Sequence, residues 1–413
     1  MRIEAGGFRG AAAPAETWGQ EGGVIDYPPS FERHVVGRVR GPRPGPTLIA
    51  VGGIHGNEPA GVRAMRRLLP SLAPLAASLR GELVLLAGNT RALERGVRYS
   101  NADLNRLWTR ENLAAVRKGA RPAAPGVEAT ELAELLAAFE SAAACARGEI
   151  FFLDLHTTSA RGVPFATVGD TLRNRAFALN FPVTLVLGLE EQVGGTMLEH
   201  VNNTGAVTMG FEAGQHEEGE AVDNHEALLR VALAASGLLA PGEVPGLEEA
   251  RATLKRAGGG ARFIEVRHRH AIRLEDEFRM TPGFENFDPV RRGQPLARDR
   301  RGLVRAREGG MILMPLYQRL GDDGFFLARE VRPFWLRLSA LLRRLRVGSC
   351  ARLLPGVARH PADPDTYVVN TRVARLMPLQ VFHLLGFRKR RWDGDRLVVS
   401  RRAYDLRGPS PRG

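Results

Sequence analysis

The residues of this chain best suited to chemistry are histidines and glutamates placed at the ends of apolar runs. In VGGIHGNEPAG an apolar run enters a glycine-rich turn that presents His55 and, three residues later, Glu58. An imidazole and a carboxylate at this spacing lie on one side of a single turn, and both are zinc ligands. Taken alone, the pattern does not separate a metal site from a hydrogen-bonded structural histidine.

A second histidine ends the apolar run IFFLDLHTT. This residue is His156, and Asp154 lies two positions earlier, on the same face of a strand. In open α/β sheets the ligand crevice forms at the carboxyl ends of the strands, so His55 and His156 should meet there. With Glu58 they would form the His2Glu set of a catalytic zinc site, which leaves a fourth position open for water.

Two further segments carry polar residues at the same predicted edge. RYSNADLNR offers Arg98, Asn105 and Arg106, and paired guanidinium groups suit a carboxylate or a developing oxyanion. A polar loop capped by Asp103 would explain the same residues. In TMGFEAGQH, Glu212 ends an apolar run; such a glutamate is usually only solvated, but beside a zinc site it is the expected general base.

The elements around these residues predict an α/β fold with a largely parallel sheet. Between residues 45 and 240, short apolar runs alternate with Ala- and Leu-rich stretches. The expected strands are 47–53, 82–88, 150–156, 183–187 and 206–212, and the clearest expected helices are 128–146 and 222–239.

Composition divides the chain into four segments. Residues 1–44 form an N-terminal segment, 45–245 the α/β domain and 260–332 a small β domain, after a linker near 245–260 that is rich in Pro, Gly and charge. Residues 333–413 form a basic extension that begins with the amphipathic stretch FWLRLSALLRRLRV. We expect this stretch to pack against the small β domain.

Composition also restricts the class of protein. A chain of 413 residues with 44% hydrophobic content is long enough for two or more cores. Cys145 and Cys350 are far apart in sequence and outside any CxxC or Cys/His pair, which excludes a disulfide framework and a thiolate metal site. The N-terminus lacks a signal-peptide pattern and no apolar run is long enough to span a bilayer, so we expect a cytoplasmic protein.

The formal charge of +13 is concentrated in the extension. Residues 333–413 contain 17 Lys/Arg and 5 Asp/Glu, a net of +12. A basic surface of this kind can contact nucleic acid, which keeps a binding protein open as an alternative to an enzyme.

The motifs, taken together, resemble a known family. The order His-x-x-Glu, Arg, Asn-Arg, His and Glu is similar to the zinc carboxypeptidase superfamily. The wording GGIHGNEPAG, RYSNADLNR, DLHTT and GFEAG, over roughly residues 47–216, resembles the aspartoacylase and succinylglutamate desuccinylase family, and FRMTPGFENFDPVRRGQPLA with GGMILMPLYQ resembles the small C-terminal β domain of bacterial members. The resemblance implies a zinc-carboxypeptidase-like mixed sheet flanked by helices, with a smaller C-terminal β domain; the basic tail would add an α+β extension.

The resemblance implies a role for each matched residue at the reaction centre. His55, Glu58 and His156 would bind one zinc ion. Glu212 would take a proton from the attacking water and later pass one to the leaving nitrogen. Arg98 would help to polarise the acyl carbonyl and would hold the oxyanion.

It also implies how substrate is held. Asn105 with Arg106 would grip the carboxylate of the amino-acid half, and Tyr317 in PLYQ would bring an aromatic ring to the pocket, with a core tyrosine as the alternative. Where family members carry an arginine for a second carboxylate, ten residues before Glu212, this chain has Asn202. Specificity for acyl-aspartate or succinyl-glutamate therefore does not follow.

These implications predict zinc-dependent hydrolysis of the amide bond of a small N-acylated amino acid or related carboxylate-bearing amide, giving a carboxylate and an amine. The expected partner is that small molecule, with no nucleic acid and no membrane, and a homo-oligomer is left open. Two alternatives remain. One is a zinc carboxypeptidase acting on peptides, and the other is a binding protein with a vestigial site whose basic tail contacts nucleic acid.

Overall fold

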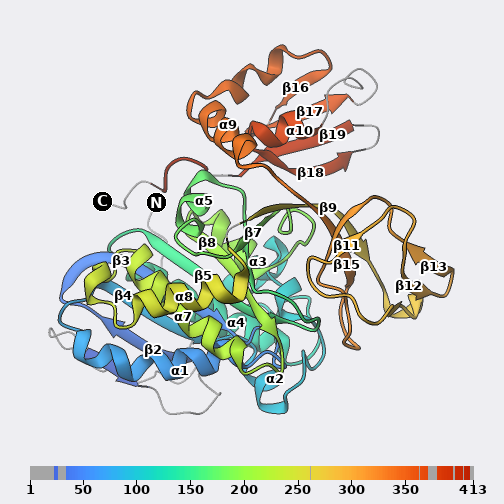
Figure 1. The fold of residues 1–413 in the computed structure, drawn as a ribbon. Coiled ribbons are helices and arrows are strands. Elements are labelled where there is room, and N and C mark those ends of the chain that lie inside the picture. Colours follow the sequence, from blue (N-terminus) through green and yellow to red (C-terminus); the bar gives the residue numbers. More distant parts are fainter. Residues whose placement is uncertain are drawn as a thin grey trace.

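The largest element of the computed structural model is a twelve-stranded mixed sheet (Figure 1). The structure describes residues 23–26, 34–260, 262–361, 363–370, 379–393, 396–402 and 404–409. In their order across the sheet, the strands are β1 (Gly23–Asp26), β2 (Val35–Arg40), β4 (Arg80–Ala87), β3 (Arg43–Gly52), β5 (Ile150–Thr158), β8 (Val207–Gln215), β6 (Phe165–Val168), β7 (Thr184–Leu187), β9 (Phe263–Ala271), β15 (Asp323–Glu330), β14 (Gly310–Leu313) and β11 (Pro289–Val290).

Two smaller sheets, ten α-helices and five short 3-10 helices complete the described part of the chain. One sheet contains β10 (Arg279–Met280), β12 (Pro295–Asp299) and β13 (Gly302–Arg305), and the other contains β16 (Val357–His360), β17 (Asp363–Asn370), β19 (Arg396–Arg401) and β18 (Phe387–Asp393). The helices are α1 (Ala60–Leu72), α2 (Thr90–Arg95), α3 (Arg110–Arg117), α4 (Glu128–Ala144), α5 (Leu172–Ala178), α6 (Met197–Asn203), α7 (Glu220–Ala235), α8 (Leu247–Gly258), α9 (Pro333–Arg344) and α10 (Leu379–Leu384). The predicted fold class is confirmed.

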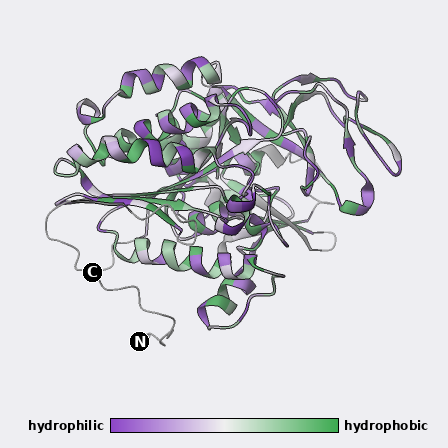
Figure 2. Cartoon of the chain, turned by 90° about the horizontal axis from the view of Figure 1, so that it is seen from below, coloured by the Kyte–Doolittle hydropathy of each residue, from purple (hydrophilic) through white to green (hydrophobic). Residues whose placement is uncertain are grey.

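Strand alternation divides the main core into two layers. Leu48 and Ala50 of β3 pack with α1 and α7 on one face, whereas Ile49 and Val51 pack with α4 on the other. The helices that cover the sheet carry hydrophilic and hydrophobic residues in alternation, as amphipathic elements do (Figure 2). The five predicted strands correspond to β3, β4, β5, β7 and β8, and the two predicted helices to α4 and α7.

The same alternation decides which chemical residues share a face. Leu153 and Leu155 of β5 belong to the layer of α1 and α7, so Asp154 and His156 face the other side. Strands β5 and β8 are parallel neighbours, and their register places Glu212 directly beside His156. The carboxyl ends of β3, β5 and β8 therefore meet at one edge, as predicted.

The expected linker near 245–260 is wrong, because this segment forms α8. The helix begins after Gly246, which has a φ of 66°, and buries Leu247, Ala250 and Leu254 in the layer of α1 and α7. Glycines stand only at its ends, and helix-forming residues fill its interior. Strand β9 follows and pairs with β7 in parallel, so the main sheet continues into the small β region. The division into domains remains a prediction.

Strand β2 extends the sheet into the predicted N-terminal segment, whose residues 1–22 and 27–33 lie outside the described part. Within the described ranges, no helix combines the length and the apolar character needed to cross a bilayer.

The basic extension docks through buried ion pairs. Asp170, which precedes α5, lies 2.9 Å from Arg343 of α9 and also pairs with Arg388 of β18 and with Arg175. The side chains of Asp170 and Arg343 are completely buried. Leu336 of α9 packs against the layer of α1 and α7. The extension thus contacts the α/β region, in addition to the small β region against which we expected its first stretch to pack.

The small β region and the end of the chain add further pairs to this interface. Glu265 of β9 pairs with Arg388 and lies 3.1 Å from His383. Arg402, which is almost fully buried, lies 3.1 Å from Glu190 in the segment after β7. Several arginines of the extension are therefore committed to carboxylates of the same chain.

Replacing Asp170 should release the extension. Breaking a buried ion pair from one side costs about 3–5 kcal/mol because it leaves uncompensated charge. We expect Asp170→Ala to lower the unfolding free energy by this order in urea denaturation and to expose α9 to limited proteolysis. Asp223→Ala is the matched control, since Asp223 is 55% exposed and pairs with Arg67 at the surface. Equal effects of the two variants would contradict this reading.

The docking should also depend on pH. Although burial raises it, Arg175, Arg343 and Arg388 hold the pKa of Asp170 well below its usual range, and His383 and Arg388 likewise lower the pKa of Glu265 to about 2. Because these carboxyl pKa values are lower in the folded state, the carboxylates stabilise docking at any pH above the ordinary carboxyl pKa of about 4. This stabilisation is lost progressively as the pH falls below about 4.

We therefore expect hydrogen exchange in α9 and β18 to accelerate between about pH 4 and pH 2 relative to α1. Exchange that accelerates equally in all three elements would assign the acid response to global unfolding instead.

Candidate active site

The turn between β3 and α1 holds the first two predicted ligands. Gly53 has a φ of 70°, and a side chain at Gly56 would come within 2.1 Å of the Ala92 carbonyl carbon. Glycine at these positions lets the turn pack tightly against α2. His55 and Glu58 are consequently buried, with 5% and 3% of their surface exposed.

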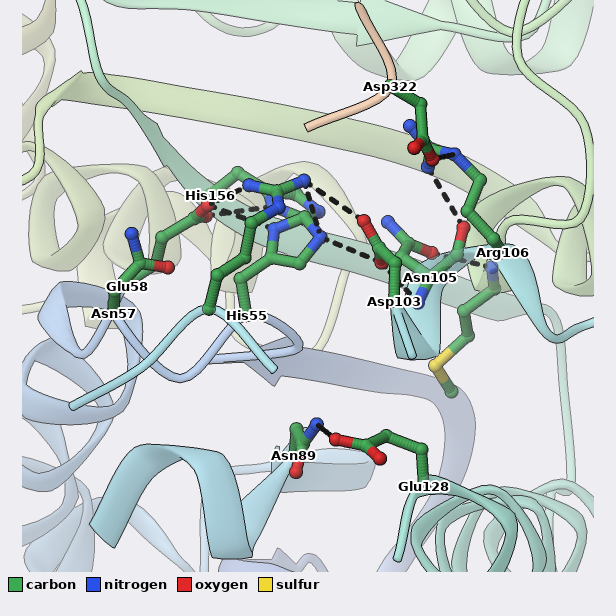
Figure 3. A network of polar contacts seen from close by, with 12 residues as sticks. His55, Asn57, Glu58, Asn89, Asp103, Asn105, Arg106, Glu128, His156 and Asp322 are labelled. Carbon is green, nitrogen blue, oxygen red and sulfur yellow. Dashed lines mark hydrogen bonds and ion pairs between the residues drawn. The ribbon is translucent and has the colours of Figure 1, made fainter. Parts of the chain in front are cut away.

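The structure brings the three predicted metal ligands together (Figure 3). Glu58 lies between the two imidazoles: Oε1 is 2.9 Å from His55 Nδ1, and Oε2 is 3.0 Å from His156 Nδ1. Ligand atoms of all three side chains lie within 4.8 Å of one another. Two imidazole nitrogens and a carboxylate are a donor set suited to zinc, and their convergence fits a single ion.

Carboxylates orient both imidazoles from behind. His55 Nε2 lies 3.1 Å from Asp103 Oδ1, and His156 Nε2 lies 3.2 Å from Asp154 Oδ2. A carboxylate on the outer nitrogen fixes the ring and raises the basicity of the nitrogen that faces the metal. Sequence analysis placed Asp154 on this face but treated Asp103 only as a cap. Asp103 orients the His55 ring and also caps its own loop, since its Oδ1 accepts from the Asn105 N–H at 2.9 Å.

Neighbouring charges control protonation at the ligand set. Burial alone would lower the pKa of His156, but Asp154 and Glu58 raise it well above its usual value. Burial would raise the pKa of Glu58, but His55 and His156 hold it well below its usual range. Metal binding would displace the imidazole proton, because a ligand must be deprotonated.

Glu212 lines the cavity beside this set. Its carboxyl is buried, and Oε2 has no hydrogen-bond partner among the described residues. Burial, with the charges of Glu58 and Asp154, raises the pKa of Glu212 to about 8. A nearby divalent cation would lower this pKa, since it stabilises the carboxylate. A buried carboxyl with an unpartnered oxygen and a raised pKa is characteristic of a functional group.

A buried glutamate fixes the loop that carries Arg98. Glu128, at the start of α4, accepts the backbone N–H groups of Ser100 and Asn101 at 2.6 and 3.1 Å. Arg98 then donates to Asp103 Oδ2 at 3.1 Å and lines the cavity. Glu128 was not predicted, because its contact crosses from a helix to a distant loop.

Asn105 and Arg106 also line the cavity, and each is held in place by a contact with another residue. Asn105 Oδ1 accepts the Met197 N–H at 3.0 Å, which fixes the orientation of the amide. Arg106 Nη2 lies 3.1 Å from Asp323 Oδ2. The Nε atom of Arg106 lies 3.6 Å from Asp322 Oδ2, and Figure 3 shows these two side chains side by side. Segment 314–323 of the small β region thus reaches the site.

That segment covers a cavity of about 140 Å³. Asn57, in the ligand turn, donates to Gln318 at 3.0 Å, and the Tyr317 N–H donates to Ser159 Oγ at 3.1 Å. The small β region therefore caps the site through contacts with two separate loops.

Two predicted positions lie away from the cavity. The Tyr317 hydroxyl donates to the Thr281 carbonyl at 2.9 Å and accepts the Phe284 N–H at 2.8 Å, so its ring does not line the cavity. Leu316 and Gln318, its neighbours, do. In this structure the side chain of Tyr317 therefore lies outside the cavity wall, and its predicted role at the pocket stays a prediction.

Asn202 is turned into the core. Its Oδ1 accepts from Asn174 Nδ2 at 2.7 Å and from Thr208 Oγ1 at 3.1 Å, and it is 2% exposed. This buried polar network accounts for the asparagine, which contributes nothing to the cavity wall.

Sequence analysis missed His216, which lines the cavity with Nδ1 2.7 Å from Thr157 Oγ1. Its place four residues after Glu212 was the available signal. It also missed the apolar wall, which is made by residues from β15 and from several loops and so has no local pattern.

Comparison with known proteins points to one family. A family model described as the succinylglutamate desuccinylase/aspartoacylase catalytic domain matches residues 44–235. The chain is 34% identical over 113 residues to a succinylglutamate desuccinylase from Burkholderia pseudomallei and 36% identical over 113 residues to one from Pseudomonas fluorescens. Each alignment covers 27% of this chain and only 30% and 31% of those relatives.

Solved structures agree with the fold. A succinylglutamate desuccinylase/aspartoacylase from Rhodobacter sphaeroides is similar with a TM-score of 0.53 at 20% identity, over 72% of this chain and 88% of that one. The product-bound ectoine utilization protein EutE (DoeB) from Ruegeria pomeroyi gives 0.52 at 22% identity, with the same coverage.

Removing an outer carboxylate should weaken metal binding without removing a ligand. We expect wild-type protein to bind one zinc ion, His156→Ala to lose it, and Asp154→Asn to bind about 10–100-fold more weakly. Competition with a zinc chelator measures each affinity. Asp322→Asn is the control, because Asp322 is half-exposed beside Arg106 and should leave affinity unchanged. Wild-type affinity in Asp154→Asn would show that the carboxylate does not support the ligand.

Proposed function

We propose that the protein is a zinc-dependent amidohydrolase of the succinylglutamate desuccinylase/aspartoacylase family, whose catalytic-domain model matches residues 44–235. Its substrate is a small N-acylated amino acid or related carboxylate-bearing amide, and its products are a carboxylate and an amine. One observation carries the proposal: Glu212, with an unpartnered carboxylate oxygen, lines a capped cavity beside the convergent His55, Glu58 and His156.

His55, Glu58 and His156 would hold the zinc ion. When bound, zinc supplies a Lewis acid that polarises the substrate carbonyl and acidifies water. Asp103 and Asp154 lie at the Nε2 atoms of the two imidazoles, which leaves both Nδ1 atoms facing Glu58.

Glu212 moves the protons. As a carboxylate it accepts a proton from the attacking water as the oxygen–carbon bond forms. It then donates this proton to the amide nitrogen as the carbon–nitrogen bond breaks, which releases a neutral amine. Its buried place on β8, directly beside His156 in the sheet register, suits both transfers.

Three polar residues position the substrate. Arg98, fixed by Asp103, supplies positive charge for the developing oxyanion. Asn105 and Arg106 bind the carboxylate of the amino-acid half. Because Asn105 Oδ1 accepts the Met197 N–H, Asn105 Nδ2 is left to donate to this carboxylate.

The capped cavity favours a small molecule over a peptide. Contacts of Gln318 and Tyr317 with the opposite loops close the site to about 140 Å³, which leaves little room for a chain. The pairing of Arg343, Arg388 and Arg402 with internal carboxylates argues against a tail built for nucleic acid. We place the protein in the reducing cytoplasm, which fits its two free cysteines, Cys145 and Cys350.

Hydrolysis by Glu212→Gln tests the mechanism. Loss of the general base should reduce amine release from N-acyl amino acids by about 10²–10⁴-fold, while zinc affinity is retained because no ligand is lost. Glu217→Gln is the control, since Glu217 is exposed nearby on the same segment. Unchanged turnover in Glu212→Gln, with zinc bound, would refute the assigned role.

A further inference from the structure

One wall of the cavity is apolar. Leu189, Val193, Met314 and Phe326 line it and belong to, or pack against, a hydrophobic cluster formed where β6, β7 and the small β region meet. The wall is thus the exposed side of a continuous core and not a set of isolated apolar residues.

The backbone at Met314 is held so that this residue reaches the cavity. Met314 has a φ of 50°, which is uncommon for a residue with a side chain. Its N–H donates to Asn286 Oδ1 at 2.7 Å, and Asn286 Nδ2 donates to Thr158 Oγ1 at 3.2 Å at the end of β5. Strain of this kind persists where the surroundings enforce it, and it concentrates at ligand-binding sites.

Leu198 extends the apolar surface toward the reaction centre. Gly210 lies two residues before Glu212 on β8 and therefore faces the same side. A side chain at Gly210 would come within 2.4 Å of Thr167 Oγ1 and 3.2 Å of Leu198 Cδ2. All of these residues line the cavity, so its floor beside Glu212 is a glycine, a threonine and a leucine.

The arginines of the cavity wall are both assigned already. Among the described residues that line the cavity, they are Arg98, which contacts Asp103 and would hold the oxyanion, and Arg106, which pairs with Asp323 and would bind the carboxylate of the amino-acid half. Asp322 and Asp323 add negative charge at the cap. A second carboxylate on the substrate would therefore find no further arginine or lysine among the described lining residues, and beside the apolar wall its charge would be costly to bury.

We propose that the acyl group taken by this site is short, uncharged and apolar, and that an acyl group ending in a carboxylate is rejected. This inference rests on the proposed amide hydrolysis. Arg106 and Asn105 serve the carboxylate of the amino-acid half, and the apolar wall with Leu198 receives the alkyl part of the acyl half.

The test compares acyl groups of equal length. Butyryl and succinyl both have four carbons and differ in one terminal carboxylate. On the same set of amino acids, zinc-loaded wild-type protein should hydrolyse the butyryl amides with a kcat/KM at least about 100-fold higher. Butyrate should likewise inhibit more strongly than succinate.

Two substitutions of Met314 test whether the apolar wall causes the preference for an uncharged acyl group. Met314→Arg places a cation on the wall with a side chain of similar length, and Met314→Leu is the apolar control. We expect Met314→Arg to shift the butyryl-to-succinyl ratio at least about tenfold toward succinyl, and Met314→Leu to leave it nearly unchanged.

The outcomes separate the two proposals. Succinyl amides hydrolysed as fast as butyryl amides by wild-type protein overturn the acyl preference and leave amide hydrolysis intact. No hydrolysis of any acyl amino acid by zinc-loaded protein overturns both.

Discussion

The Glu58 carboxylate, buried between Nδ1 of two imidazoles, is the interaction on which the site depends. Behind the imidazoles stand Asp103 and Asp154, so three carboxylates and two histidines share a space with little solvent. Burying this much negative charge is costly unless cations compensate it. Imidazolium protons supply part of that charge, as the raised pKa of His156 indicates. A divalent ion at the same point would supply it more completely and would keep the ligands in place.

The fold provides this arrangement from separate elements. The glycine turn after β3 brings His55 and Glu58 to the sheet edge, and the register of β5 with β8 sets His156 beside Glu212. Glu128 holds the loop that delivers the remaining charged groups. The small β region then caps the site and adds Met314 and Phe326 to an apolar wall that Leu189 and Val193 begin, so one cavity joins a charged reaction centre to a hydrophobic surface. That combination is the basis of the proposed substrate, which has one polar and one alkyl half.

Sequence reasoning found the strands, the sheet edge and the cluster of His55, Glu58 and His156 that could hold a metal ion, because each depends on local pattern. His156 and Asp154 share a strand face by period-two alternation alone. The rest depends on tertiary contact. Asp103 reads as a cap until the ring of His55 is placed against it, and the ring of Tyr317 turns away because backbone groups of the small β region satisfy its hydroxyl. The linker expected near 245–260 failed because glycines that end a helix resemble those of a loop.

The most direct measurement is a crystal structure of zinc-loaded protein with anomalous data collected at the zinc edge. We expect one strong peak bonded to Nδ1 of His55, Nδ1 of His156 and an oxygen of Glu58, with Asp103 and Asp154 still on the outer nitrogens. A zinc ion bonded instead to the Nε2 atoms or to Asp103, or a peak elsewhere in the molecule, would contradict the assigned centre and the mechanism built on it.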